Sequence, residues 1–172
     1  ALAVSGRRAE PADASQCHPR VDVDPGARLA WDGLPTVITD AGSLTRSLTI
    51  TLGRDASAVL RETLVLGRTG ERGGRLTANT DVSDARGPIV REALEVRGDS
   101  RVPGILRAHR AMDSISSVGD QAPVADVPGV TRLELDRAGT VVRYLGESAH
   151  DSPLGGVLLD AALLDREPAH VV

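Results

Sequence analysis

The chain has 172 residues and a net charge of −4, a size typical of one globular domain. It contains one Trp, one Tyr and no Phe, so it lacks the aromatic rings that usually stack the bases of single-stranded nucleic acid. The acidic balance also disfavours phosphate-backbone binding, and no apolar run reaches the ~18 residues that a membrane span needs. The single cysteine excludes an intramolecular disulfide and favours a reducing compartment. We therefore expect a cytoplasmic protein that binds neither nucleic acid nor membrane.

Alternation of apolar and polar residues runs from residue 21 to about residue 97, which predicts short strands separated by Gly and Pro turns. The clearest strands are 44–52 and 57–66, whose apolar residues share one face in each. A three-residue loop between them favours an antiparallel hairpin that pairs Leu48 with Leu60.

Later segments predict two further hairpins and up to two helices. Residues 76–82 and 90–96 form one strand pair, and residues 130–136 and 140–145 form the other. Within 98–128, apolar residues recur at helical spacing; they are Ile105, Ala108, Met112 and Ile115. A second helix is expected to begin at Pro153, with Asp151 or Ser152 as its cap, and to run to about Asp165.

Three charged residues interrupt the apolar faces of the predicted strands: Arg46, Glu62 and Glu92. In the predicted hairpin, Arg46 lies opposite Glu62, so we expect these side chains within hydrogen-bonding reach. One interpretation is a structural ion pair, which by itself is weak evidence of stability. The other is a hydrated interior whose carboxylates suit a divalent cation in transit.

Several motifs resemble catalytic or ligand sites but lack essential parts. The glycine-rich segment from Gly67 to Arg75 has no Lys-Ser/Thr pair and precedes a strand, which favours a tight β-connection over a phosphate loop. Ser148, His150 and Asp151 lie too close in the sequence to converge as a triad. Cys17 and His18 are adjacent potential metal ligands without a matching cluster. The sequence therefore predicts no enzyme active site.

Five segments, in order, are similar to motifs of the UreD/UreH family of urease accessory proteins. One of them, which closes with Gly67, Arg68, Gly70 and Glu71, is similar to the family's strongest signature, and Arg143 and Tyr144 lie in another. The segments are Val23–Trp31, Pro35, Glu62–Glu71, Gly87–Glu92 and Val142–Ser148. The resemblance covers about 21–97 and 140–150 and is weak over 98–128.

The resemblance implies a mainly β fold: layered antiparallel hairpins in a UreD-like, β-helix-like scaffold with one or two α-helices. Residues 1–172 are expected to form a single UreD-like domain that lacks the family's N-terminal strands. The implied function is non-catalytic: a scaffold for nickel insertion into apo-urease, with UreF and the GTPase UreG as further partners. Nickel would be cargo in transit rather than a permanently bound cofactor, and Glu62, Glu92 and Arg46 are the candidate tunnel residues. The alternative is a β-rich interaction domain of another assembly with no metal role.

Overall fold

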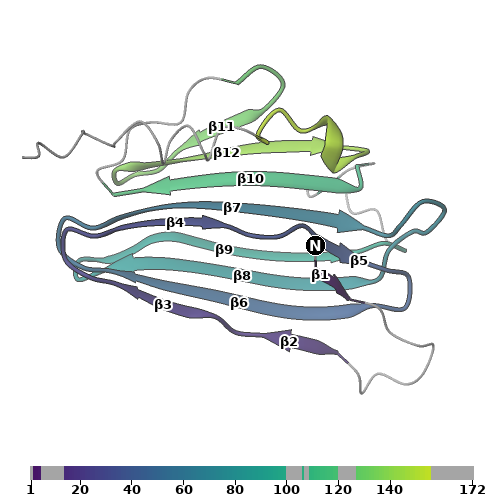
Figure 1. Cartoon of the computed structure of the whole chain (residues 1–172), viewed down its shortest axis with the longest axis horizontal. Coiled ribbons are helices and arrows are strands. Elements are labelled where there is room, and N and C mark those ends of the chain that lie inside the picture. The colour runs from purple at the N-terminus through teal and green to yellow at the C-terminus, as the bar shows by residue number, and fades with distance from the viewer. Residues whose placement is uncertain (1, 5–13, 100–105, 107–108, 120–126, 156–172) are drawn as a thin grey trace, which may run out of the picture.

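The computed structural model describes residues 2–4, 14–99, 106, 109–119 and 127–155, in which twelve strands and one short 3-10 helix form (Figure 1). The strands are β1 (Leu2–Val4), β2 (Ser15–Cys17), β3 (Arg20–Val23), β4 (Arg28–Asp32), β5 (Thr36–Ile38), β6 (Ser43–Leu52), β7 (Ser57–Leu66), β8 (Arg75–Asp84), β9 (Gly87–Arg97), β10 (Ala111–Val118), β11 (Thr131–Glu134) and β12 (Gly139–Gly146). The 3-10 helix η1 spans Ala149–Asp151. The described part of the chain has no helix long and apolar enough to span a bilayer. The predicted mainly β class is confirmed.

The strands form two mixed sheets. The seven-stranded sheet has the order β1-β5-β7-β10-β12-β11, with β4 also paired to β7. The five-stranded sheet has the order β2-β6-β8-β9, with β3 also paired to β6. Apolar residues of both sheets share the same clusters, so the sheets pack face to face.

The central part of the chain alternates between the sheets, in the manner of a β-helix. From β3 to β8 the chain passes from the five-stranded sheet to β4 and β5, back to β6, across to β7 and back to β8. Successive strands within one sheet are therefore parallel, as in β3–β6, β6–β8, β4–β7 and β5–β7. A parallel pair needs a crossover connection, and here a strand of the opposite sheet provides it.

The predicted hairpin between 44–52 and 57–66 is wrong. These segments are β6 and β7, which lie in different sheets, and β6 pairs with β8 while β7 pairs with β10. Both arrangements bury the same apolar faces, because the face of a strand is fixed by residue parity and not by its neighbour. The alternation therefore predicted which side chains point inward, but not the strand that each segment pairs with.

The two later hairpins are confirmed. β8 and β9 are antiparallel, with Val82 opposite Val90 and a register shift just after Val82. β11 and β12 are antiparallel as well, with Thr131 opposite Arg143. Both are local connections, so the turn residues alone were sufficient to predict them.

The helix predictions fail wherever the described residues test them. Met112 and Ile115 lie in β10, where a spacing of three places their side chains on opposite faces. Both faces of β10 are covered: Met112 packs between the sheets and Ile115 packs on the outer face of the seven-stranded sheet. Ile105 and Ala108 lie outside the described residues. Pro153 begins a turn, and residues 156–165 of the second predicted helix also lie outside them.

The space between the sheets holds two separate apolar clusters. One contains Ile38, Leu44, Leu64, Leu66, Leu76, Ala78, Val96, Leu106 and Met112. The other contains Val23, Leu48, Ile50, Leu52, Ala56, Ala58, Leu60, Val82, Val90 and Val118. A third, smaller cluster of Val59, Ile115, Val142 and Leu154 covers the outer face of the seven-stranded sheet.

Candidate functional site

Arg46 and Glu62 form an ion pair that crosses the space between the sheets. Nη2 of Arg46 lies 2.5 Å from Oε1 of Glu62, and each side chain is 16% exposed. The predicted contact is therefore confirmed, although the two residues meet across the sandwich and not along one sheet. Their inward direction follows from the parity of the flanking residues Leu44, Leu48 and Leu60.

A second pair, between Glu92 of β9 and Arg143 of β12, also joins the two sheets. Nη1 and Nη2 of Arg143 lie 2.8 and 2.9 Å from the two carboxylate oxygens, which is a bidentate contact. Nε of Arg143 donates to Oγ of Ser114 at 2.9 Å. The sequence indicated both Glu92 and Arg143 as candidates, but the predicted strand order gave no reason to pair them.

The two pairs lie at the same level of the sandwich. In the seven-stranded sheet, Ser114 is in register with Glu62 on one side and with Arg143 on the other. In the five-stranded sheet, Thr80 is in register with Glu92. Arg46 is in register with Ala78, which is the next inward-facing residue of β8 before Thr80. We call the set Arg46, Glu62, Thr80, Glu92, Ser114 and Arg143 the polar layer. It separates the two inner apolar clusters.

The polar layer is electrically balanced. Two guanidinium groups oppose two carboxylates, so the layer has no net charge to trap an ion. Nε of Arg46 is buried and has no hydrogen-bond partner among the described residues. A buried donor without a partner costs about 1–3 kcal/mol, and an ordered water in the layer would remove that cost.

The other metal-ligand candidates do not converge. Cys17 is exposed and lies beside Arg46 in the register of β2 and β6. His18 places Nε2 3.4 Å from Oε1 of Gln16. No group of three potential ligands (His, Cys, Asp or Glu) forms within the described ranges. A cation in the polar layer would therefore meet carboxylate oxygens that are already paired with arginine.

The segment from Gly67 to Glu71 forms a tight turn between β7 and β8. Gly67, Gly70 and Gly73 all have positive φ, and a Cβ on Gly67 would lie 2.8 Å from the backbone nitrogen of Gly73. Oε2 of Glu71 accepts a 2.8 Å hydrogen bond from the backbone N–H of Arg68. These contacts are internal to the turn.

Ser148 and Tyr144 also have local structural contacts. Oγ of Ser148 accepts a 3.1 Å hydrogen bond from the backbone N–H of His150 and caps the 3-10 helix. Tyr144 packs against the outer apolar cluster, and its ring lies so close to Gly146 that any Cβ there would clash. Ser148 therefore has a capping role in this structure.

Asp113 of β10 is the polar residue that the sequence failed to indicate. It is fully buried and accepts four hydrogen bonds, from Nε and Nη2 of Arg61, Oγ1 of Thr63 and Oγ of Ser152, at 2.6–3.2 Å. The hydrogen bond to Asp113 is the main cause that raises the pKa of Arg61. The available signal is the polar alternation of Arg61 and Thr63 on the outer face of β7, but the spacing of Met112 and Ile115 predicts a helix around Asp113.

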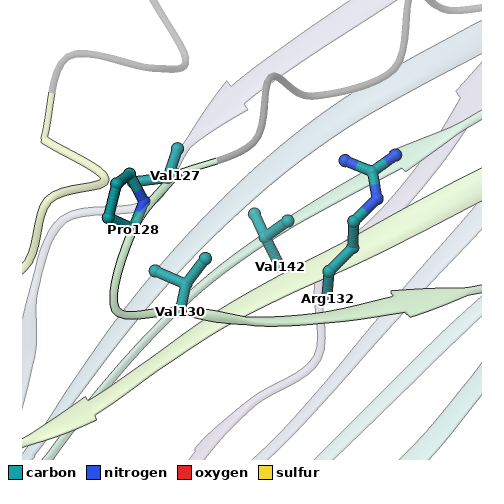
Figure 2. Close-up of a pocket in the computed structure, with 5 residues that line it drawn as sticks. All are labelled: Val127, Pro128, Val130, Arg132 and Val142. Atoms are coloured by element: carbon teal, nitrogen blue, oxygen red, sulfur yellow. The ribbon is translucent and has the colours of Figure 1, made fainter.

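A pocket of about 270 Å³ lies on the outer side of β11 and β12 (Figure 2). Its lining is apolar apart from one cation and consists of Val127, Pro128, Val130, Arg132 and Val142. Arg132 is already held by Glu134, with Nε 2.5 Å from Oε1. Among the described residues, this lining includes no nucleophile and no acid–base pair.

Comparison with known proteins agrees with the sequence resemblance. A family model described as "UreD urease accessory protein" matches residues 6–154. Urease accessory protein UreD 1 of Streptomyces griseus is 36% identical over 132 residues, which cover 76% of this chain and 51% of that relative. UreD of Streptomyces avermitilis is 34% identical over 159 residues, which cover 85% of this chain and 57% of that relative. The chain thus spans about half the length of these curated relatives.

Proposed function

Because the chain belongs to the UreD family of urease accessory proteins, we propose that it is a non-catalytic scaffold through which nickel passes toward apo-urease. The observation that supports this proposal is the polar layer, which crosses the space between the sheets and divides an otherwise apolar interior. Glu62, Glu92 and Arg46 are the proposed transit residues.

A polar layer suits a cation in transit better than a resident one. A dry interior opposes a hydrated divalent ion, because desolvation of a charge in a low-dielectric medium is costly. Carboxylate and hydroxyl oxygens, with water among them, can replace hydration ligands one at a time. The paired arginines keep the layer neutral, so the ion is not held in a deep electrostatic minimum. Nickel is cargo in this proposal and not a cofactor.

In this proposal the polar layer is open to an ion from outside the sandwich on both of its sides. Beside Arg46 and Glu62, the neighbouring strand is interrupted in each sheet: β2 ends at Cys17 before β3 begins at Arg20, and β4 ends at Asp32 before β5 begins at Thr36. On the opposite side, Glu92 is 37% exposed and belongs to β9, the last of the described strands in its sheet.

The family resemblance further supports UreF, UreG and apo-urease as partners and the cytoplasm as the site of action. In this proposal the apo-urease contact receives the nickel, while UreG, as the GTPase of the assembly, controls its release. The chain contributes the passage and the surfaces that hold the assembly together.

The test is the nickel content of urease purified from cells that carry the wild-type gene, no gene, Glu62→Gln, Glu92→Gln or the double variant. We expect nickel-poor urease without the gene, and a slower gain of nickel with the double variant. Glu95→Gln is the matched control, since Glu95 is exposed and lies on the same strand as Glu92. Fully loaded urease in the deletion strain would remove the delivery role. Normal nickel loading with the double variant would exclude Glu62 and Glu92 as transit residues but would leave the delivery role of the chain intact.

The second candidate is a β-rich interaction domain of another assembly without a metal role. The charge balance of the polar layer favours it, because both carboxylates already have arginine partners. In that case Glu62→Gln would change the stability of the chain and leave urease nickel unaffected.

A further inference from the structure

β6, β8 and β11 finish at the same end of the sandwich (Figure 1). A pocket of about 460 Å³ lies at this end. Its walls are three connections: the β6–β7 loop at 53–56, the β8–β9 turn at 85–86, and the β11–β12 turn at 137–138. Both sheets therefore contribute to it, and its shape depends on how they are held together at this end.

Arg137 holds the two sheets together beside the pocket. Its Nη1 donates to the backbone oxygens of Gly87 at 3.1 Å and Pro88 at 3.3 Å, and its Nη2 pairs with Oδ2 of Asp84. Arg86 binds the same carboxylate through Nε and Nη2 at 3.2 and 3.1 Å. Two guanidinium groups thus converge on one carboxylate. The hydrogen bond from Arg137 lowers the pKa of Asp84 to about 2, so Asp84 is ionised at neutral pH and offsets only one of the two arginine charges.

Arg54 adds a third cation on the β6–β7 loop. Its exposed side chain forms no hydrogen bond or ion pair with any described residue, and it follows directly on Gly53 in the pocket wall. Three arginines and two aspartates line the pocket, which gives it a charge of +1 in a chain whose net charge is −4. The local charge is therefore opposite in sign to that of the chain.

Apolar side chains complete the lining, among them Leu52, Ala56 and Ile89. Five of the twelve lining residues are charged, whereas small-molecule sites are mostly apolar and enclose their ligand. Turns on a rigid scaffold commonly bind proteins, and arginine is enriched at such interfaces while unpaired surface charge steers partners of opposite sign. The lining therefore favours a protein segment over a small metabolite.

We propose that this pocket, the end pocket, binds an acidic segment of a partner protein. A carboxylate of that segment lies between Arg54 and Arg86, and a neighbouring apolar side chain rests on the partly buried Ile89. Asp84 and Arg137 are positioning residues that keep the Arg86 turn against the other sheet. This inference does not depend on nickel transit.

The test is a titration of the isotope-labelled chain with a synthetic peptide of alternating leucine and glutamate, blocked at both ends, followed by amide NMR shifts. We expect saturable shifts at Arg54, Arg86 and Ala138, with a midpoint on the order of 1 mM or below for two surface ion pairs. The Arg54→Glu, Arg86→Glu double variant should weaken binding about tenfold or more. The Arg54→Gln, Arg86→Gln variant should weaken it less, and the amide spectrum of each variant reports its folding.

Two comparisons make the result decisive. Arg68→Glu with Arg72→Glu makes the same charge change in exposed residues at the opposite end of the sandwich, and it should leave binding within twofold. A peptide of leucine and glutamine should not bind. Equal binding of the glutamine peptide, an equal loss with the opposite-end variant, or no saturable shift would overturn the proposal. Equal saturation by inorganic phosphate would assign a simple anion site instead.

Discussion

Arg46 of β6 and Glu62 of β7 bridge the two sheets through one ion pair, with 2.5 Å between Nη2 and Oε1. The pair lies between the two inner apolar clusters, where removal of one partner leaves the other charge without compensation. This pair and the Glu92–Arg143 pair therefore join the sheets at the level where the two clusters meet.

We predict that Glu62→Ala lowers the free energy of unfolding by about 1–3 kcal/mol, since Arg46 then remains poorly solvated. A double variant, Arg46→Met with Glu62→Leu, should recover most of that loss because it replaces the pair with apolar side chains. Urea denaturation of the four members of the cycle measures both effects. If the loss of unfolding free energy in the double variant equals the sum of the losses in the two single variants, the two residues are not coupled.

We predict that Asp113→Ala lowers the free energy of unfolding by about 3 kcal/mol, because Arg61, Thr63 and Ser152 lose a shared buried acceptor. Ser152→Ala removes only one of these bonds and should cost about 1 kcal/mol. Hydrogen exchange at the Leu154 amide should accelerate in both variants, since Ser152 holds this turn on the sheet. Unchanged exchange at Leu154 would mean that the apolar contacts of Leu154 hold the turn without Asp113.

We predict that the Arg137–Asp84 contact weakens in acid. The folded pKa of Asp84, about 2, is below its ordinary value of 3.8. The contact therefore stabilises the folded chain above pH 3.8 and loses this effect as the pH falls towards about 2. Arg137→Gln should raise the pKa of Asp84 in an NMR titration, and its stability deficit should shrink over the same pH range. A deficit that does not vary with pH would instead assign Arg137's contribution to its bonds with Gly87 and Pro88.

We predict that Gly67→Ala destabilises the chain more than Gly70→Ala does. Both glycines have positive φ, so both substitutions should cost about 1–2 kcal/mol in backbone strain. A Cβ at Gly67 also meets the backbone of Gly73 and Glu71 within 3.0 Å, whereas a Cβ at Gly70 meets nothing within 4 Å. The difference in free energy of unfolding between the two variants measures the cost of that close approach. Equal values would show that the turn can relax.

The inward-facing residues were predictable because strand parity is a local property. The positions of Arg46, Glu62 and Glu92 on otherwise apolar faces follow from the sequence, as do the β8–β9 and β11–β12 hairpins with their short turns. The Arg46–Glu62 contact was predicted from a hairpin that does not form. The prediction succeeded because the residues lie at the same level in either arrangement.

The sequence by itself determined the β class, the face of each long strand and the local turns, since each depends on residues within a few positions of one another. Only the tertiary structure decided that β6 and β7 stack face to face, that Glu92 meets Arg143, and that Asp113 is buried beneath Ser152. These relationships join residues that lie 16 to 51 positions apart. The alternation of side chains along a strand is a local property, so it is compatible with several pairing strands and contact residues at such separations. The packing of both sheets at once decides which of them is chosen.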